Sequence, residues 1–175
     1  MNTNIIHHSW QPILREFNTD AFLLFKDKIL RENYDYPKAD EVFRIFSMSL
    51  FDIQVVMLDE RENPSLSKQG VFILPLSLTR GVDIGHDIFW KPFIKKVVNL
   101  IASYNKCIWL LRSTKAQAFT ANIPVRSIFN VQRYDDETIK HIPNGYYNYI
   151  FKGKEINFEY VNIILSKKGQ KLIHW

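Results

Sequence analysis

Short apolar runs that alternate with an amphipathic stretch constrain the fold of this chain more than any other feature. Residues 54–58, 71–74 and 107–111 are rich in β-branched or bulky apolar side chains and end at polar residues or proline, as buried strands do. The stretch that begins at Pro92 has an apolar stripe and a lysine-rich opposite side, which predicts a helix between the second and third runs. This alternation predicts a mostly parallel sheet with helices on both faces.

Other segments of the chain fit the same architecture. Residues 10–30 carry spaced apolar side chains that predict helices packed on a core. Residues 116–121 and 158–168 predict two more helices, the second with Tyr160, Ile163 and Ile164 facing inward, and residues 127–131 predict a fourth strand.

The chain has 175 residues, which suffice for one good core and are too few for two ordinary domains. No repeat, low-complexity stretch or Gly/Ser linker divides it. We therefore predict a single α/β domain over residues 1–175, with three α/β/α layers around a central, mostly parallel four-stranded sheet. Residues 1–8 are predicted to form a flexible tail.

The net charge of +5 and the sequence pI near 9.2 favour an anionic partner, which is a nucleic acid, an acidic protein or a membrane surface. Ordinary solubility is the alternative explanation. The single cysteine, Cys107, lies in an apolar run, which predicts a buried free thiol in a reducing compartment. No signal segment and no run of ~18 apolar residues is present, so a soluble, cytoplasmic protein without a membrane partner is expected.

Motifs for common catalytic chemistry are absent from the sequence. It has no Walker loop, no dinucleotide-binding glycine motif, no Cys/His spacing for zinc and no nucleophile elbow. We therefore expect neither a metal ion nor a cofactor. The Asn-, Ile- and Lys-rich composition hints at a low-GC genome, such as that of a mobile element or virus.

A series of short motifs, in order and at characteristic spacing, spans nearly the whole chain. They are Ser-Trp-x-Pro at 9–12, Tyr-Pro at 36–37, Gln-Gly-Val at 69–71, Leu-Thr-Arg at 78–80, His, Trp and Phe at 86, 90 and 93, Ala-Gln at 116–117 and Ile-His-Trp at 173–175. Taken together, the series resembles family 1 uracil-DNA glycosylase. The resemblance implies that family's three-layer fold, with its functional edge at the carboxyl ends of the strands.

The residues that carry catalysis in that family have altered counterparts here. The family's water-activating Gly-Gln-Asp-Pro-Tyr-His loop corresponds to the segment that begins with Asp59, Glu60 and Arg61. In the ungapped match, the Asp of that loop aligns with Arg61. A shift of two positions would bring Asp59 or Glu60 to that place. The family's uracil-reading Asn falls at Pro75, which has no hydrogen-bonding side chain, and its base-stacking segment is reduced to residues 65–68.

A second family loop, His-Pro-Ser-Pro-Leu, falls in a region without His, Pro or Leu, where Arg133 lies near the His position and Tyr134 near the Leu position. These differences predict a catalytically inactive homologue that is not an enzyme. The alternative is an enzyme with altered chemistry that uses Asp59, Glu60 or His86.

Two binding functions fit a retained fold. The first is binding of an acidic protein partner, such as a DNA-mimic glycosylase inhibitor, or of a replication protein, across the former DNA-binding face. The second is a non-catalytic DNA-binding accessory protein, in which aromatic residues of the segment 144–154 stack on unpaired bases. These aromatic residues are Tyr146, Tyr147, Tyr149 and Phe151. An edge hairpin is the alternative structure for this segment.

The residues predicted to contact the partner or DNA follow strand ends or flank the replaced loops. They are Arg80, His86, Lys91, Lys115, Arg126, Arg133 and Tyr134. For His86, a structural hydrogen bond inside the fold is the alternative role.

Overall fold

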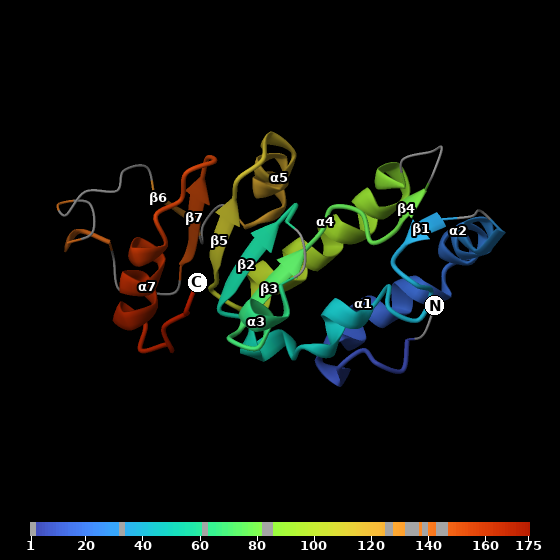
Figure 1. Ribbon diagram of the computed structural model, residues 1–175, viewed down its shortest axis with the longest axis horizontal. Helices are drawn as coiled ribbons and strands as arrows, with labels where there is room; N and C mark the ends of the chain where they lie inside the picture. Colours follow the sequence, from blue (N-terminus) through green and yellow to red (C-terminus); the bar gives the residue numbers. More distant parts are fainter. Residues whose placement is uncertain are drawn as a thin grey trace.

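A computed structural model describes most of the chain (Figure 1). The described residues are 3–31, 34–60, 63–81, 86–124, 128–131, 137, 140–142 and 147–175. The central sheet contains β2 (Val55–Leu58), β3 (Val71–Leu74), β5 (Ile108–Leu111), β6 (Ile128–Val131) and β7 (Asn148–Lys152). A short antiparallel pair is formed by β1 (Tyr34–Tyr36) and β4 (Arg80–Gly81).

Helices cover both faces of the sheet. The α-helices are α1 (Gln11–Leu14), α2 (Asp20–Arg31), α3 (Pro64–Ser67), α4 (Asp87–Tyr104), α5 (Thr114–Ala118) and α7 (Phe158–Lys167). The described residues also form the 3-10 helices η1 (His8–Trp10), η2 (Arg15–Asn18), η3 (Arg44–Ser47), η4 (Leu50–Asp52) and η5 (Phe119–Asn122). The N-terminal helices and α7 lie at opposite ends of the molecule (Figure 1). Within the described part of the chain, no helix is both long and apolar enough to cross a membrane.

The central sheet has the strand order β3-β2-β5-β7-β6, and all four strand pairs are parallel. The prediction of a three-layer α/β/α fold around a parallel sheet is therefore confirmed, with five strands where four were expected. The extra strand is β7, which lies between β5 and β6. Since Tyr149 and Phe151 are buried in it, the predictions of an edge hairpin and of base stacking by these two rings are wrong.

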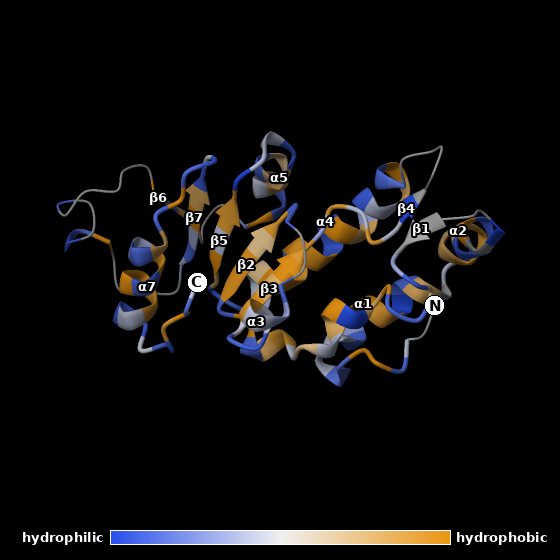
Figure 2. Ribbon diagram, viewed as in Figure 1, coloured by the Kyte–Doolittle hydropathy of each residue, from blue (hydrophilic) through white to orange (hydrophobic). Residues whose placement is uncertain are grey.

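Successive residues of β2, β3 and β5 enter different cores, as the alternation of side chains along a strand requires. Val56 and Leu58 belong to the core shared with α4 and the N-terminal segments, whereas Val55 and Met57 belong to the core shared with α7. Burial on both faces explains why the strands are continuously apolar, as the hydrophobic colours of β2, β3 and β5 show (Figure 2).

The two long helices of these layers differ in detail from their predictions. Helix α4 begins at Asp87, five residues before Pro92, so the prediction that this proline opens the helix is wrong. The predicted water-facing side of α4, with Lys95 and Lys96, is confirmed. Helix α7 buries Val161, Ile164 and Leu165. Its predicted inward stripe is therefore only partly correct, since Ile163 is 37% exposed.

The N-terminal residues 3–8 are held against the fold, which differs from the predicted tail. The His7 N–H donates a hydrogen bond to the Phe46 carbonyl at 2.9 Å, and Ile5 and Ile6 pack on the core. Next to them, the Trp10 indole N–H donates to the Met48 carbonyl at 2.8 Å. The Ser-Trp motif therefore anchors the start of the chain.

The last residues of the chain are also held by hydrogen bonds. They lie at the edge of the sheet where the strands begin, which we call the amino edge. The Gln69 side chain accepts from the His174 N–H at 2.7 Å and donates to the His174 carbonyl at 3.1 Å. The rings of Phe158 and Trp175 stack with centroids 4.3 Å apart. The Gln-Gly-Val and Ile-His-Trp motifs therefore meet each other and have structural roles.

Cys107 is a buried free thiol, as predicted. Burial raises its pKa from the ordinary value of 9.0 to about 12, although the nearby ammonium groups of Lys168 and Lys106 act in the opposite direction. Because the folded state holds the thiol proton more tightly than the unfolded state, this group's contribution to stability is complete below pH 9.0 and declines as the pH rises towards 12.

We expect iodoacetamide to leave Cys107 unlabelled in the native protein and to label it after unfolding in urea. The physical reason is that the thiolate is the reactive species, and burial suppresses both its formation and its access to the reagent. Mass spectrometry after timed exposure measures the labelled fraction. Labelling of the native protein at the rate of the unfolded chain would contradict the burial of this thiol.

Candidate functional site

Polar residues directly follow the ends of the neighbouring strands β2 and β5. They lie at the edge of the sheet where the strands end, which we call the carboxyl edge. The Ser113 hydroxyl, which follows β5, donates to the Asp59 carboxylate at 2.5 Å. The same hydroxyl oxygen accepts from the Ala116 N–H at 3.0 Å and thereby caps the start of α5. In Figure 1 the arrowheads of β2, β5 and β7 point towards this carboxyl edge, where α5 lies.

Asp59 turns the chain sharply as it leaves β2. Its φ of 64° is positive, which for a residue other than glycine costs roughly 1–2 kcal/mol. The Asp59 N–H donates to the Leu74 carbonyl at 3.0 Å, so the turn is tied to the end of β3. The turn and the Ser113 hydroxyl together hold this exposed carboxylate at the carboxyl edge.

A second polar contact joins the same strand ends. The Arg112 guanidinium lies 3.3 Å from the Glu60 carboxylate, and its Nε donates to the Lys154 carbonyl at 3.2 Å. Both charged side chains are partly exposed, so the ion pair adds little to stability. Its effect is to place a cation between the loops that follow β2, β5 and β7.

The start of α4 borders this edge. The Lys115 ammonium, on α5, lies 3.8 Å from the Asp87 carboxylate in the first turn of α4. Lys91 lies one helical turn beyond Asp87, so the two residues share a face of α4. Arg80, Lys91 and Lys115 are all exposed, as a role in partner contact requires, but Arg80 lies in β4, which pairs with β1 and not with the central sheet.

His86 lies inside the fold, only 2% exposed. Its Nδ1 is 2.8 Å from the Thr79 hydroxyl, which also accepts a hydrogen bond from the Trp90 indole N–H at 2.7 Å. The prediction that His86 contacts a partner is therefore wrong, because its ring is buried beside Thr79 and packs edge-on against Phe25 of α2. Its alternative role, a structural hydrogen bond, is confirmed.

The remaining predicted contact residues, Arg126, Arg133 and Tyr134, lie outside the described residues. Tyr146, from the predicted base-stacking segment, does too. Among the residues that the structure does describe, no group of three His, Cys, Asp or Glu side chains is placed to hold a metal ion.

Cationic side chains outnumber carboxylates among the described residues of the carboxyl edge. The cations are Lys91, Arg112, Lys115, Lys152 and Lys154, and the carboxylates are Asp59, Glu60, Asp87 and Glu155. Sequence reasoning missed Arg112, Lys152 and Lys154, although Arg112 directly follows a predicted strand and the same rule would have found it. The edge thus carries one more cation than carboxylates, and two of the carboxylates, Asp59 and Glu60, are held by Ser113 and Arg112.

Sequence comparison finds no family profile and no curated protein that matches the chain. Solved structures match it at low identity. Mimivirus uracil-DNA glycosylase has a TM-score of 0.69 and 12% identity, over 98% of this chain and 87% of that one. The fold is that of the uracil-DNA glycosylases.

Two further uracil-DNA glycosylase structures support this assignment of the fold. A mimivirus UNG variant in complex with UGI has a TM-score of 0.72 and 12% identity, over 100% of this chain and 91% of that one. The UNG of Nitratifractor salsuginis has a TM-score of 0.52 and 12% identity, over 69% of this chain and 82% of that one.

The prediction that the chain is not an enzyme is wrong, because the solved structures that share its fold are uracil-DNA glycosylases. The loop after β2 also keeps two carboxylates, Asp59 and Glu60, at the carboxyl edge. Arg61, at which the ungapped match places the family's Asp, lies outside the described residues. Differences between short motifs therefore do not establish a loss of catalysis.

Proposed function

We propose that this chain binds an acidic protein partner of the UGI type through the carboxyl edge of its uracil-DNA glycosylase-like fold. The observation that carries the proposal is the excess of exposed cations around α5 and the first turns of α4. It is supported by two of the similar solved structures, which are mimivirus UNG variants in complex with the inhibitor UGI.

The cations of this edge are available to a partner. The side chain of Lys115 is 75% exposed, and among the described residues its ion pair is the 3.8 Å contact with Asp87. Such an exposed pair contributes roughly 0–1 kcal/mol, so an incoming carboxylate can replace it at small cost. Complementary charge of this kind speeds association and sets the orientation of the partners.

Reversing two charges at the edge should weaken UGI binding by about tenfold or more, because Lys91→Glu with Lys115→Glu turns attraction into repulsion. Fluorescence titration of labelled UGI measures the change. Lys171→Glu is the matched control, since Lys171 is also an exposed lysine but lies in the segment after α7, near the amino edge. Equal losses in the double variant and the control would contradict the proposed surface.

Duplex DNA is the alternative partner. Titrating the same protein with DNA at several salt concentrations distinguishes DNA binding from UGI binding. Binding to phosphates releases counterions, so DNA affinity must fall steeply as salt is raised. Salt-sensitive DNA binding without any UGI binding would overturn the proposal in favour of a DNA-binding accessory role.

A further inference from the structure

A groove of about 550 Å³ lies between the N-terminal helices and the outer face of α4. Its lining comes from α1, η2, the middle and C-terminal turns of α4, and η5. Volumes of this size are typical of binding clefts. The groove involves neither α5 nor the first turn of α4, so it is separate from the carboxyl edge.

The floor of the groove is apolar, and one end is aromatic. Pro12 and Leu100 supply its accessible apolar surface, whereas Ile13 beneath them is only 4% exposed. Asn99, Ser103 and Asn122 add polar side chains to the lining. At the C-terminal end of α4, Tyr104 is 59% exposed and Phe51 beside it is 64% exposed, with ring centroids 6.4 Å apart. Adjacent exposed rings next to an apolar floor are typical of protein-binding surfaces.

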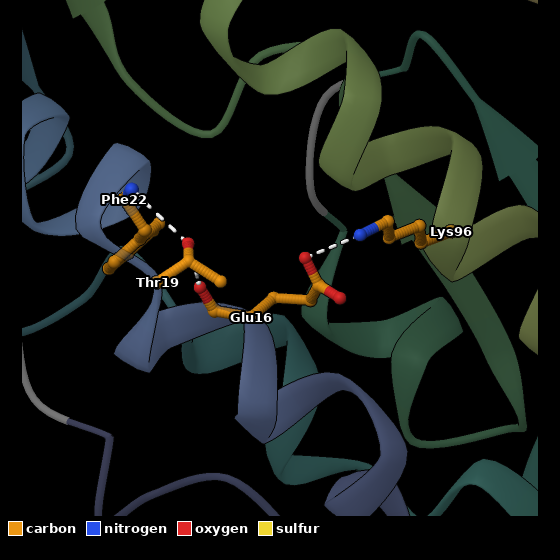
Figure 3. A network of polar contacts seen from close by, with 4 residues as sticks. All are labelled: Glu16, Thr19, Phe22 and Lys96. Atoms are coloured by element: carbon orange, nitrogen blue, oxygen red, sulfur yellow. Dashed lines mark hydrogen bonds and ion pairs between the residues drawn. The ribbon is translucent and has the colours of Figure 1, made fainter.

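The rim of the groove is cationic. Lys95 and Lys96 project from α4, and Glu16 is the only carboxylate among the described lining residues. The Lys96 ammonium lies 2.5 Å from the Glu16 carboxylate and bridges α4 to η2 (Figure 3). Lys95 makes no ion pair with any described residue, so the rim carries a net positive charge.

We propose that this groove docks an acidic amphipathic segment of a partner protein. Apolar side chains of the segment would pack on Pro12, Leu100 and Tyr104, while its carboxylates pair with Lys95 and compete with Glu16 for Lys96. A nucleic acid fits less well, because its phosphates would leave the apolar floor uncovered. A second copy of this chain would bring a like charge of +5 to the same surface.

Peptide selection tests the proposal directly. A phage library of random peptides about 16 residues long, roughly four helical turns, is selected on the intact protein. We expect enriched peptides to carry carboxylates together with apolar residues at helical spacing. Their affinity, measured by fluorescence anisotropy, should fall by about tenfold in Lys95→Glu and in Tyr104→Ala.

Glu16→Gln should have the opposite effect and tighten peptide binding by a few-fold, since it releases Lys96 for the peptide. Lys95 and Tyr104 are exposed and Glu16 is half-buried, and circular dichroism verifies that each variant is folded. Lys171→Glu should bind the peptides as the unmodified protein does. Enrichment of peptides without carboxylates, or equal binding to all variants, would overturn the proposal, as would a self-association that is abolished by Tyr104→Ala.

Discussion

Replacing Asn148 with leucine should lower the free energy of unfolding by about 3–5 kcal/mol. Asn148 is fully buried at the start of β7. Its carbonyl oxygen accepts from the Trp109 indole N–H at 2.9 Å and from the Cys107 N–H at 3.3 Å, and its amide donates to the Ala102 carbonyl at 3.2 Å. Leucine has a similar volume but satisfies none of these groups, and each unsatisfied buried group costs about 1–3 kcal/mol.

Urea unfolding followed by tryptophan fluorescence measures this loss. Asn130→Leu is the matched control, since Asn130 lies on the neighbouring strand β6 and is exposed. We expect the control to change stability by less than about 0.5 kcal/mol. A leucine variant at position 148 that is as stable as the control would show that Asn148 does not join β7 to β5 and α4.

The second large effect is expected at Gly70, where Gly70→Ala should lower the free energy of unfolding by about 2–4 kcal/mol. The φ of Gly70 is +85°, and a methyl group there would lie 2.9 Å from the Asp52 carbonyl oxygen. The strained backbone costs about 1–2 kcal/mol, and the contact forces the start of β2 to move. The Gly70 carbonyl accepts from the N–H groups of Gln54 and Val55, so this movement would disturb the first pairing of β2 with β3.

Gly169→Ala separates the two causes at Gly70. Gly169 has a φ of +67°, but nothing lies within 4 Å of the position that a methyl group would take. The Gly169→Ala variant should therefore lose only the ~1–2 kcal/mol of unfolding free energy that a positive φ costs a residue with a side chain. Urea unfolding of both variants measures the difference, and equal losses would show that the close approach to Asp52 is not a steric barrier.

The architecture could be predicted from the sequence because its main signals are local. Strands buried on both faces must be continuously apolar, and β2, β3 and β5 are. Strand β7 was missed because it begins with a polar residue, Asn148, whose partners Cys107 and Trp109 are about forty positions away in the sequence. The strand order of the sheet depends on such distant pairings, which no local pattern reveals.

The candidate site could be predicted only in part for the same reason. The rule that functional residues follow strand ends found Lys91 and Lys115, which are exposed near the carboxyl edge, and Arg80, which is exposed in the separate β1–β4 pair. It did not reveal the contact between Asp59 and Ser113, which are 54 positions apart. His86 was misplaced because a motif position does not show whether a side chain points to solvent or, as here, towards Thr79.

Hydrogen exchange measured with and without saturating UGI tests the central claim most directly. Binding at the carboxyl edge should slow the exchange of backbone amides in residues 86–91 and 112–118, and leave residues 168–175 near the amino edge unchanged. Slower exchange confined to residues 168–175, or no change anywhere in the chain, would contradict the account.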